Sequence, residues 1–191
     1  MPLSIVHYNE PILRKKGNKV TDFGPEIEAF GRDMIAAMHA AEGIGLGAQQ
    51  VGKALQVCVV DLRKSDAEYS WELDGGKPPP EIFMPMILVN PRVIPTPGAA
   101  ETAYEEGCLS FPGIRGDVTR PDEITAEYQD EHGTPHRLRC NGLLARCILH
   151  EIDHLNGVLF IDRMEKATRA ELDEAIRALA RETRDRTRTR A

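Results

Sequence analysis

The chain lacks long apolar segments and has no regular cysteine pattern. No stretch of its 191 residues approaches the roughly 20 consecutive apolar residues of a membrane span. Residues 1–4 lead into no apolar run of signal-peptide length. The four cysteines are irregularly spaced, which indicates no disulfide framework and a reducing compartment. We therefore expect a cytoplasmic protein without a membrane partner, although a processed organellar protein would share these features.

The sequence also lacks an internal repeat and a phosphate-binding loop. Its glycine-rich segment, residues 43–50, has neither the spacing nor the Lys-Ser/Thr ending of such a loop, so nucleotide binding is not expected. By itself this segment also fits a helix C-cap followed by a turn. A chain of this length with 41% hydrophobic residues is ample for one core, and we expect no second globular domain.

What the chain does contain is a short motif suited to a metal-bound water, HEIDH at residues 150–154. Side chains four apart lie over one another on a helical face, so His150 and His154 can converge on one divalent ion. In this HExxH pattern a glutamate, here Glu151, serves as general base in metal-assisted hydrolysis. Short patterns also arise by chance, and a histidine pair also fits a solvated or core-facing helix surface.

A catalytic metal site needs a third protein ligand and one open position. The metzincin extension would require a histidine at position 160, where the chain has Phe160. In gluzincins the third ligand is a downstream glutamate. The acids that follow the motif here lie in a charged amphipathic stretch and fit a solvated helix face: Glu165, Glu171, Asp173 and Glu174.

The remaining candidates for a third ligand are upstream cysteines. Cys147 shares the helical face of the two histidines, but positions seven apart are separated by roughly 10 Å along a helix, so we expect it to line the site. Cys58 lies in an apolar β-type run and fits a small buried hydrophobe, and Cys140 has no site-like neighbours. Cys108 lies in a loop where glycine permits close approach and proline stiffens the exit, so its thiolate can be presented to a ligand.

Three segments together resemble the peptide deformylases. They are GIGLGAQQ at residues 43–50, EGCLS at residues 106–110 and HEIDH at residues 150–154, in the family's order and with roughly its separations. The resemblance extends from about Val6 to Arg163. It implies an α+β fold in which antiparallel β-sheets pack around a central motif-bearing helix, with an N-terminal helix and a C-terminal helix.

The resemblance also implies a metal site and an activity. Cys108, His150 and His154 would bind one divalent ion and leave one position for water. Ferrous iron is the ion that the family commonly uses, and Zn²⁺, Ni²⁺ or Co²⁺ are alternatives, since a cysteine and two histidines also suit zinc. The implied reaction removes the N-formyl group from the N-terminal formylmethionine of nascent polypeptides and releases formate.

Hydrolysis of an unreactive amide has three chemical requirements. A nucleophile at neutral pH would come from the metal-bound water. The Gln50 side-chain amide and the Leu109 backbone N–H would face the oxyanion, where one such donor contributes about 3 kcal/mol. Glu151 would take the proton from the water and deliver it to the departing amine. Without the resemblance, Gln50 would be an ordinary polar loop residue.

The resemblance implies further substrate contacts, and the chain departs from the family pattern near them. The glycine-rich segment would let an extended peptide lie along the backbone. Gly47 and Gln49 stand where alanine and proline are common, which predicts a looser loop around Gln50. Arg146 stands at a typically apolar position, which puts methionine selectivity in question. The implied substrate-binding residues are Ile44, Gly45, Tyr104, Glu106, Gly107, Leu143, Arg146 and Cys147.

Two other readings use the same residues. An endopeptidase would share the HExxH motif, but it is disfavoured by the missing downstream ligand and by Cys108. A ribosome-associated binding protein with a structural metal is disfavoured because Glu151 and Gln50 are both present, and because a structural site tends to be closed by four protein ligands.

Periodicity predicts most of the elements around these motifs. Apolar residues at helical spacing predict a helix over 25–41, and the motif helix is expected over 141–155. Strands are predicted at 55–61, 87–90, 123–129 and 136–139, the last two joined by a hairpin turn. The segment 63–86 is a surface excursion that either flanks the substrate groove or has no role. His132 and His136 are expected to face solvent.

The C-terminus differs in charge from the rest of the chain. Residues 167–181 have an amphipathic helical pattern, and residues 181–191 contain five arginines against two acids, which gives +3 in a chain of −6. We therefore divide the chain into a single catalytic domain, 1–166, and a C-terminal helix with a basic tail, 167–191. The basic tail favours either contact with ribosomal RNA, the partner that the resemblance suggests, or a disordered solubilising role.

Overall fold

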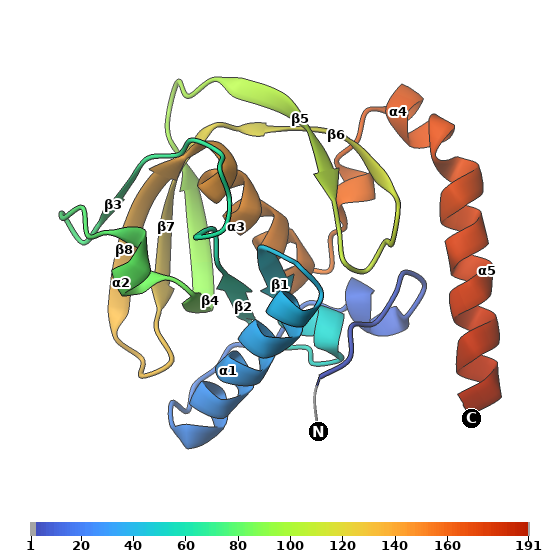
Figure 1. The fold of residues 1–191 in the computed structure, drawn as a ribbon, viewed down its shortest axis with the longest axis horizontal. Coiled ribbons are helices and arrows are strands. Elements are labelled where there is room, and N and C mark those ends of the chain that lie inside the picture. Colours follow the sequence, from blue (N-terminus) through green and yellow to red (C-terminus); the bar gives the residue numbers. More distant parts are fainter. Residues whose placement is uncertain (1–2, 191) are drawn as a thin grey trace.

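The helix with the HExxH motif, α3 (Gly142–Leu155), lies between two antiparallel sheets in the computed structural model, which describes residues 3–190 (Figure 1). The smaller sheet is a ribbon of β5 (Glu101–Gly107) and β6 (Arg115–Pro121). This arrangement confirms the predicted α+β class. The larger sheet has the order β1 (Gly45–Gly47), β2 (Val57–Val60), β4 (Met86–Pro95), β7 (Glu123–Gln129), β8 (Pro135–Asn141) and β3 (Trp71–Leu73).

The N-terminal helix α1 (Pro25–Ala40) confirms the helix predicted over 25–41. Pro25 at its first turn suits the fixed backbone angle of proline. Met34 and Met38 are fully buried one helical turn apart, in the cluster that packs α1 against β1 and β2. The N–H of Gly43 bonds to the carbonyl of Met38 just past the helix end, so the chain turns directly into β1.

The β7–β8 hairpin confirms the strands that were predicted at 123–129 and 136–139 from alternating apolar and polar residues. Ile124, Ala126 and Tyr128 are buried in β7, and the residues between them are half-buried. Asp130 and Thr134 close the turn through a backbone hydrogen bond. The ribbon of β5 and β6 was not predicted, because most side chains of β5 are exposed and its sequence has no apolar alternation.

The excursion at residues 63–86 extends the larger sheet. It contains β3, which pairs with β8 at the outer edge, and the short helix α2 (Pro80–Phe83). Asp74 anchors it by accepting hydrogen bonds from His136 and from the backbone N–H of Arg137. His136 is thus half-buried against an acid, whereas His132 is exposed as predicted. Within residues 3–190, the main cavity is lined by no residue of the excursion.

One face of α3 is buried against the larger sheet through Leu144, Ala145, Ile148 and Leu155. Two short 3₁₀ helices, η1 (Pro11–Arg14) and η2 (Ala48–Val51), contact each other, η2 also contacts α3, and η3 (Phe160–Asp162) follows α3. The buried apolar face fixes the rotation of α3 and so decides which of its side chains face the cavity. Those side chains are Leu143, Arg146, Cys147, His150 and Glu151.

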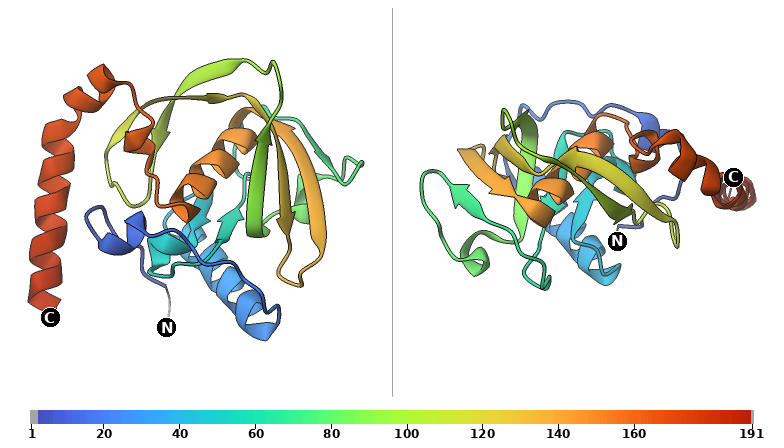
Figure 2. Two further views of the ribbon diagram at one scale, coloured as in Figure 1. Left: turned by 180° about the vertical axis from the view of Figure 1, so that it is seen from behind. Right: turned by 90° about the horizontal axis from the view of Figure 1, so that it is seen from above.

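The C-terminal segment forms two helices, α4 (Lys166–Glu171) and α5 (Asp173–Arg190). The predicted helix at 167–181 is therefore interrupted at Leu172, and the interpretation of residues 181–191 as disordered is wrong for those that the structure describes. Ile176 and Leu179 are buried in a cluster that includes Leu13 and Phe160, so packing holds α5 along one side of the molecule (Figure 2). No helix of residues 3–190 is long and apolar enough to cross a membrane.

Candidate active site

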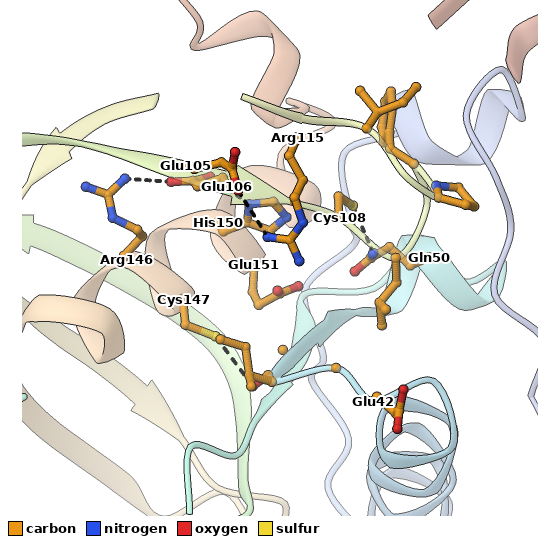
Figure 3. A pocket seen from close by; sticks show the side chains of 18 of the residues that line it. Glu42, Gln50, Glu105, Glu106, Cys108, Arg115, Arg146, Cys147, His150 and Glu151 are labelled. Carbon is orange, nitrogen blue, oxygen red and sulfur yellow. Dashed lines mark hydrogen bonds and ion pairs between the residues drawn. The ribbon is translucent and has the colours of Figure 1, made fainter. Parts of the chain in front are cut away.

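Three segments that are distant in sequence surround one cavity of about 540 Å³ (Figure 3). Helix α3 contributes His150 and Glu151, the end of β5 leads into Cys108, and η2 contributes Gln50. These residues, Leu109 and all eight expected substrate-binding residues line the cavity. His154 lies outside the lining and is 1% exposed.

Cys108, His150 and His154 bring one ligand atom each to within 4.8 Å of one another. The Sγ of Cys108 is 3.3 Å from Nε2 of His154. Burial lowers the pKa of His154 well below its usual value, so its imidazole is neutral and can offer a lone pair. Nδ1 of His150 is 2.9 Å from Glu106, so Nε2 is the atom that can act as a ligand. Burial would lower the pKa of His150, but hydrogen bonds to Cys108 and Glu106 outweigh it and raise that pKa, so binding of an ion would displace a proton from this ring. The donor set of one sulfur and two nitrogens therefore fits a divalent transition-metal ion.

Cys147 does not join this group, as helical rise predicted. Its buried Sγ instead lies 3.5 Å from the carbonyl oxygen of Ile44. Cys58 and Cys140 are buried apolar residues of the core, and all four cysteines are free thiols. Among the cysteines, only Cys108 is close enough to both histidines to act with them.

Glu106 orients His150 by bonding to Nδ1, the ring nitrogen that is not the expected ligand atom. Its carboxylate accepts hydrogen bonds from His150, from Arg120 at 2.6 and 3.0 Å, and from Arg146 at 2.8 Å. Burial would raise the pKa of Glu106, but the hydrogen bonds from His150 and Arg120 outweigh it and lower the pKa to about 2. Glu106 is therefore a permanent anion that fixes the ring of His150.

Glu151 lies deep in the cavity wall and is 4% exposed. Burial raises the pKa of its carboxyl to about 7, and its Oε2 has no hydrogen-bond partner in the part of the chain that the structure describes. Gly45 allows this placement, because a Cβ at position 45 would lie only 2.9 Å from the carboxyl carbon of Glu151. A buried carboxyl with a near-neutral pKa and a free oxygen is suited to take up and return a proton.

Gln50 directs its amide toward Cys108. Its Oε1 accepts a 2.7 Å hydrogen bond from the N–H of Gly47, which fixes which end of the amide faces the cavity. Its Nε2 lies 3.4 Å from both Cys108 Sγ and Ser110 Oγ. Leu109, whose backbone N–H is the second expected donor, lines the same cavity. Gln50 is thus a fixed donor beside the candidate metal position.

The loop around Gln50 is held more firmly than its sequence suggested. Gln49 is fully buried, and its Nε2 donates to the carbonyls of Lys15 and Leu155, each at 3.3 Å. These bonds tie η2 to the N-terminal segment and to the end of α3. The expectation of a looser loop is therefore wrong, because the residue in the proline position provides hydrogen bonds that proline could not.

Sequence reasoning missed the ion pairs beneath the site. Arg120 of β6 is 4% exposed and joins Glu106 to Asp153, which also pairs with Arg163. Asp153 lies inside the HEIDH motif, and its charge on an otherwise buried helical turn was the one available signal. Nothing in the local sequence of Arg120 distinguishes it from the exposed arginines of the chain.

Comparisons with known proteins agree in sequence and in structure. The family described as polypeptide deformylase matches residues 2–170. The peptide deformylase of Opitutus terrae is 59% identical over 184 residues, which cover 96% of each chain. A peptide deformylase crystal structure from Synechococcus elongatus in complex with actinonin has a TM-score of 0.78 and 39% identity, covering 93% of this chain and 86% of that one. An inhibitor complex of an Arabidopsis thaliana peptide deformylase has a TM-score of 0.83 and 33% identity, covering 97% and 94%.

Proposed function

The chain belongs to the polypeptide deformylase family, and from this membership we propose which of its residues carry out the reaction. It is a metal-dependent hydrolase that removes the formyl group from the N-terminal formylmethionine of nascent polypeptides and releases formate. The observation that carries the assignment is the convergence of Cys108, His150 and His154 beside Glu151 and Gln50 in one cavity.

Cys108, His150 and His154 hold one divalent ion, with Fe²⁺ favoured in the cell and Zn²⁺, Ni²⁺ or Co²⁺ as alternatives. A bound ion supplies an activated water at neutral pH and polarises the formyl carbonyl. Support comes from the donor set, since a thiolate and two imidazoles suit iron and zinc alike. Anaerobic purification followed by metal analysis tests the identity of the ion.

Glu151 is the general base and then the general acid. Its carboxylate takes a proton from the attacking water, and the carboxyl returns it to the departing amine nitrogen. The near-neutral pKa supports both steps, because neither protonation state is strongly favoured at the working pH.

The Nε2 of Gln50 and the backbone N–H of Leu109 donate to the oxygen of the formyl group as it gains negative charge. The bond from Gly47 to Oε1 supports this role, because it holds the amide in one orientation before substrate arrives. A preorganised donor stabilises charge that develops in the transition state without a reorganisation cost.

The peptide lies between the free edges of β1 and β5. Among residues 3–190 each of these strands pairs on one side only, so its other edge can accept an extended chain. Ile44, Gly45 and Gly107 line this path. The first side chain enters the pocket bordered by Tyr104, Glu106, Leu143, Arg146 and Cys147.

The test is formate release from a formyl-Met peptide by Glu151→Gln beside the unaltered protein. Glutamine keeps the shape but cannot accept and return the proton, so we expect a loss of 10²–10⁴-fold in kcat with the metal retained. Full activity of the metal-loaded variant would reject the role of Glu151. Cleavage of internal peptide bonds without formate release would instead indicate an endopeptidase.

We also propose that α5 contacts ribosomal RNA. Arg177, Arg181, Arg184 and Arg188 are exposed and recur at helical spacing, so they form one stripe about 16 Å long, separate from the buried face of α5. A stripe of arginines on a chain of net charge −6 matches the phosphate backbone of an RNA helix.

Ribosome co-sedimentation at several salt concentrations tests this contact. Replacement of the four stripe arginines by glutamine should weaken binding at least about tenfold and flatten its salt dependence. Substitution is better than truncation, because Thr183 is buried and Arg186 bonds to His7. The matched control replaces four exposed arginines elsewhere, Arg32, Arg92, Arg137 and Arg139. Equal loss in both variants would indicate a general charge effect.

Residues 1–166 form the catalytic unit, so a chain that ends there should retain formate release but unfold at lower temperature, since Ile176 and Leu179 leave the core. The protein acts in the cytoplasm, as its free thiols and its nascent-chain substrate favour. Fractionation of the source cells tests the location.

A further inference from the structure

Arg146 is buried on α3 one helical turn before His150, beside the cavity. Its Nη1 donates to Glu106 and to the carbonyl of Val118, each at 2.8 Å. Its Nη2 donates to the carbonyl oxygen of Thr102 at 2.7 Å and to its Oγ1 at 3.1 Å. Its guanidinium carbon also lies 5.4 Å from the centre of the Tyr104 ring.

The contacts of Arg146 with β5 are possible because alternate residues of a strand project from the same face. Thr102, Tyr104 and Glu106 alternate along the strand and therefore project from the same face. One guanidinium contacts all three, and Val118 pairs with Tyr104 across the ribbon. Arg146 thus spans three alternate positions on one face of β5, of which only Glu106 is buried, and reaches β6 behind them.

The ribbon needs such an attachment. β5 and β6 form a separate two-stranded sheet, and an isolated two-stranded ribbon is marginally stable in water. Most of β5 is exposed, so apolar burial along the strand contributes little to its position. The polar contacts of Glu106 and Arg146 join this face of β5 to α3.

Arg146 presents no free cation to an apolar side chain. Both terminal nitrogens donate to protein acceptors, and the anionic Glu106 lies 2.8 Å away. Glu106, which Arg146 shares with Arg120 and His150, and the carbonyl oxygens of Val118 and Thr102 therefore stabilise the charge inside the wall of the pocket. This explains how the cavity accommodates an arginine beside a methionine side chain.

We propose that Arg146 is a positioning residue that clamps β5 to α3. By holding Thr102 and Tyr104 it sets the wall of the pocket for the first side chain. By sharing Glu106 with His150 it also sets the orientation of a metal ligand. The inference rests on the proposed site assignment, and it adds that substrate selectivity and metal retention are coupled through one side chain.

Two substitutions separate the two effects. In Arg146→Met the stem is retained and every hydrogen bond is lost, so both pocket and ligand should loosen. In Arg146→Lys one charged donor is retained, which can pair with Glu106 but cannot also hold Thr102. Arg139→Met is the control, because Arg139 is an exposed arginine that pairs with Glu123 away from the cavity.

The readouts are the rate of metal transfer to a chromogenic chelator and the ratio of kcat/KM for formyl-Met and formyl-Leu peptides. For Arg146→Met we expect weaker metal retention by 10–100-fold and a fall of about tenfold in the preference for methionine. For Arg146→Lys we expect nearly normal metal retention and a raised KM for formyl-Met with the same loss of preference. Arg139→Met should change neither readout.

An unchanged methionine preference in Arg146→Lys would overturn the proposal, and so would unchanged metal retention in a folded Arg146→Met. If Arg146→Met does not fold, Arg146→Lys decides, since it keeps the buried charge. A wild-type protein that binds no metal or releases no formate would instead refute the underlying site assignment, so the two failures are distinguishable.

Discussion

Replacement of Gly45 by alanine should lower the activity of the enzyme about 100-fold without unfolding it. Gly45 lies in β1 directly opposite Glu151 and is not in the left-handed region of backbone conformation, so alanine suits the backbone there. The added methyl group would lie 2.8 Å from Cys147 Sγ and 2.9 Å from the Glu151 carboxyl carbon, and nearer still to one carboxyl oxygen.

The size of the effect follows from these separations. Ordinary van der Waals contact at such a site begins at 3.4 Å, so the carboxyl group must move by at least about half an ångström and its nearer oxygen by more. A displacement approaching 1 Å in a positioned catalytic group costs about 10²-fold in rate. That loss corresponds to about 2.7 kcal/mol of transition-state stabilisation.

The assay is formate release from a formyl-Met peptide, with metal content and thermal unfolding measured on the same sample. Gly47→Ala is the matched control, because its methyl group would meet Glu151 Oε2 at 3.6 Å and His154 Cβ at 3.0 Å. We expect this control to lose far less activity. A metal-loaded Gly45→Ala enzyme with kcat close to wild type would refute the argument that Gly45 fixes the position of Glu151.

Three further outcomes are expected. Gln50→Glu keeps an acceptor for the Gly47 N–H but offers no donor to the substrate oxygen, so kcat should fall 10²–10³-fold in formate-release assays. Hydrogen bonds from Arg63 and His39 outweigh the burial that would raise the pKa of Asp61 and lower that pKa to about 2. The resulting stability is present above the unfolded pKa near 4 and lost as pH falls toward 2, so in denaturation experiments the advantage over Asp61→Asn should vanish across that window. Prolonged chelation should abolish formate release, and Fe²⁺ added anaerobically should restore it; activity that survives complete metal removal would contradict the metal requirement.

The parts of the fold that were predicted depend on local patterns. The i, i+4 spacing of His150 and His154 determines their shared helical face wherever the helix is placed. The periodicity of α1 and the alternation of β7 and β8 likewise reflect one buried face along a continuous segment. The β5–β6 ribbon escaped prediction because its position depends on polar contacts with α3, which leave no apolar pattern in the sequence.

The end of the C-terminal helix also could not be predicted from local sequence. Its last two turns are rich in arginine and polar residues, which is typical of a solvated tail. They are helical because Thr183 is buried and Arg186 and Thr187 bond to His7 and Glu10 near the other end of the chain. Contacts across more than 170 residues cannot be inferred from local composition.

The sequence by itself determined the metal-binding motif, the family and more than half of the residues that line the cavity, because those properties depend on residue type and short spacing. Only the tertiary structure decided how Cys108 meets a histidine 46 residues away, how Glu106 holds His150, and what Arg146 does beside an apolar pocket. The physical reason is that a buried charge is defined by its partners, and the partners of Arg146 lie on two other strands.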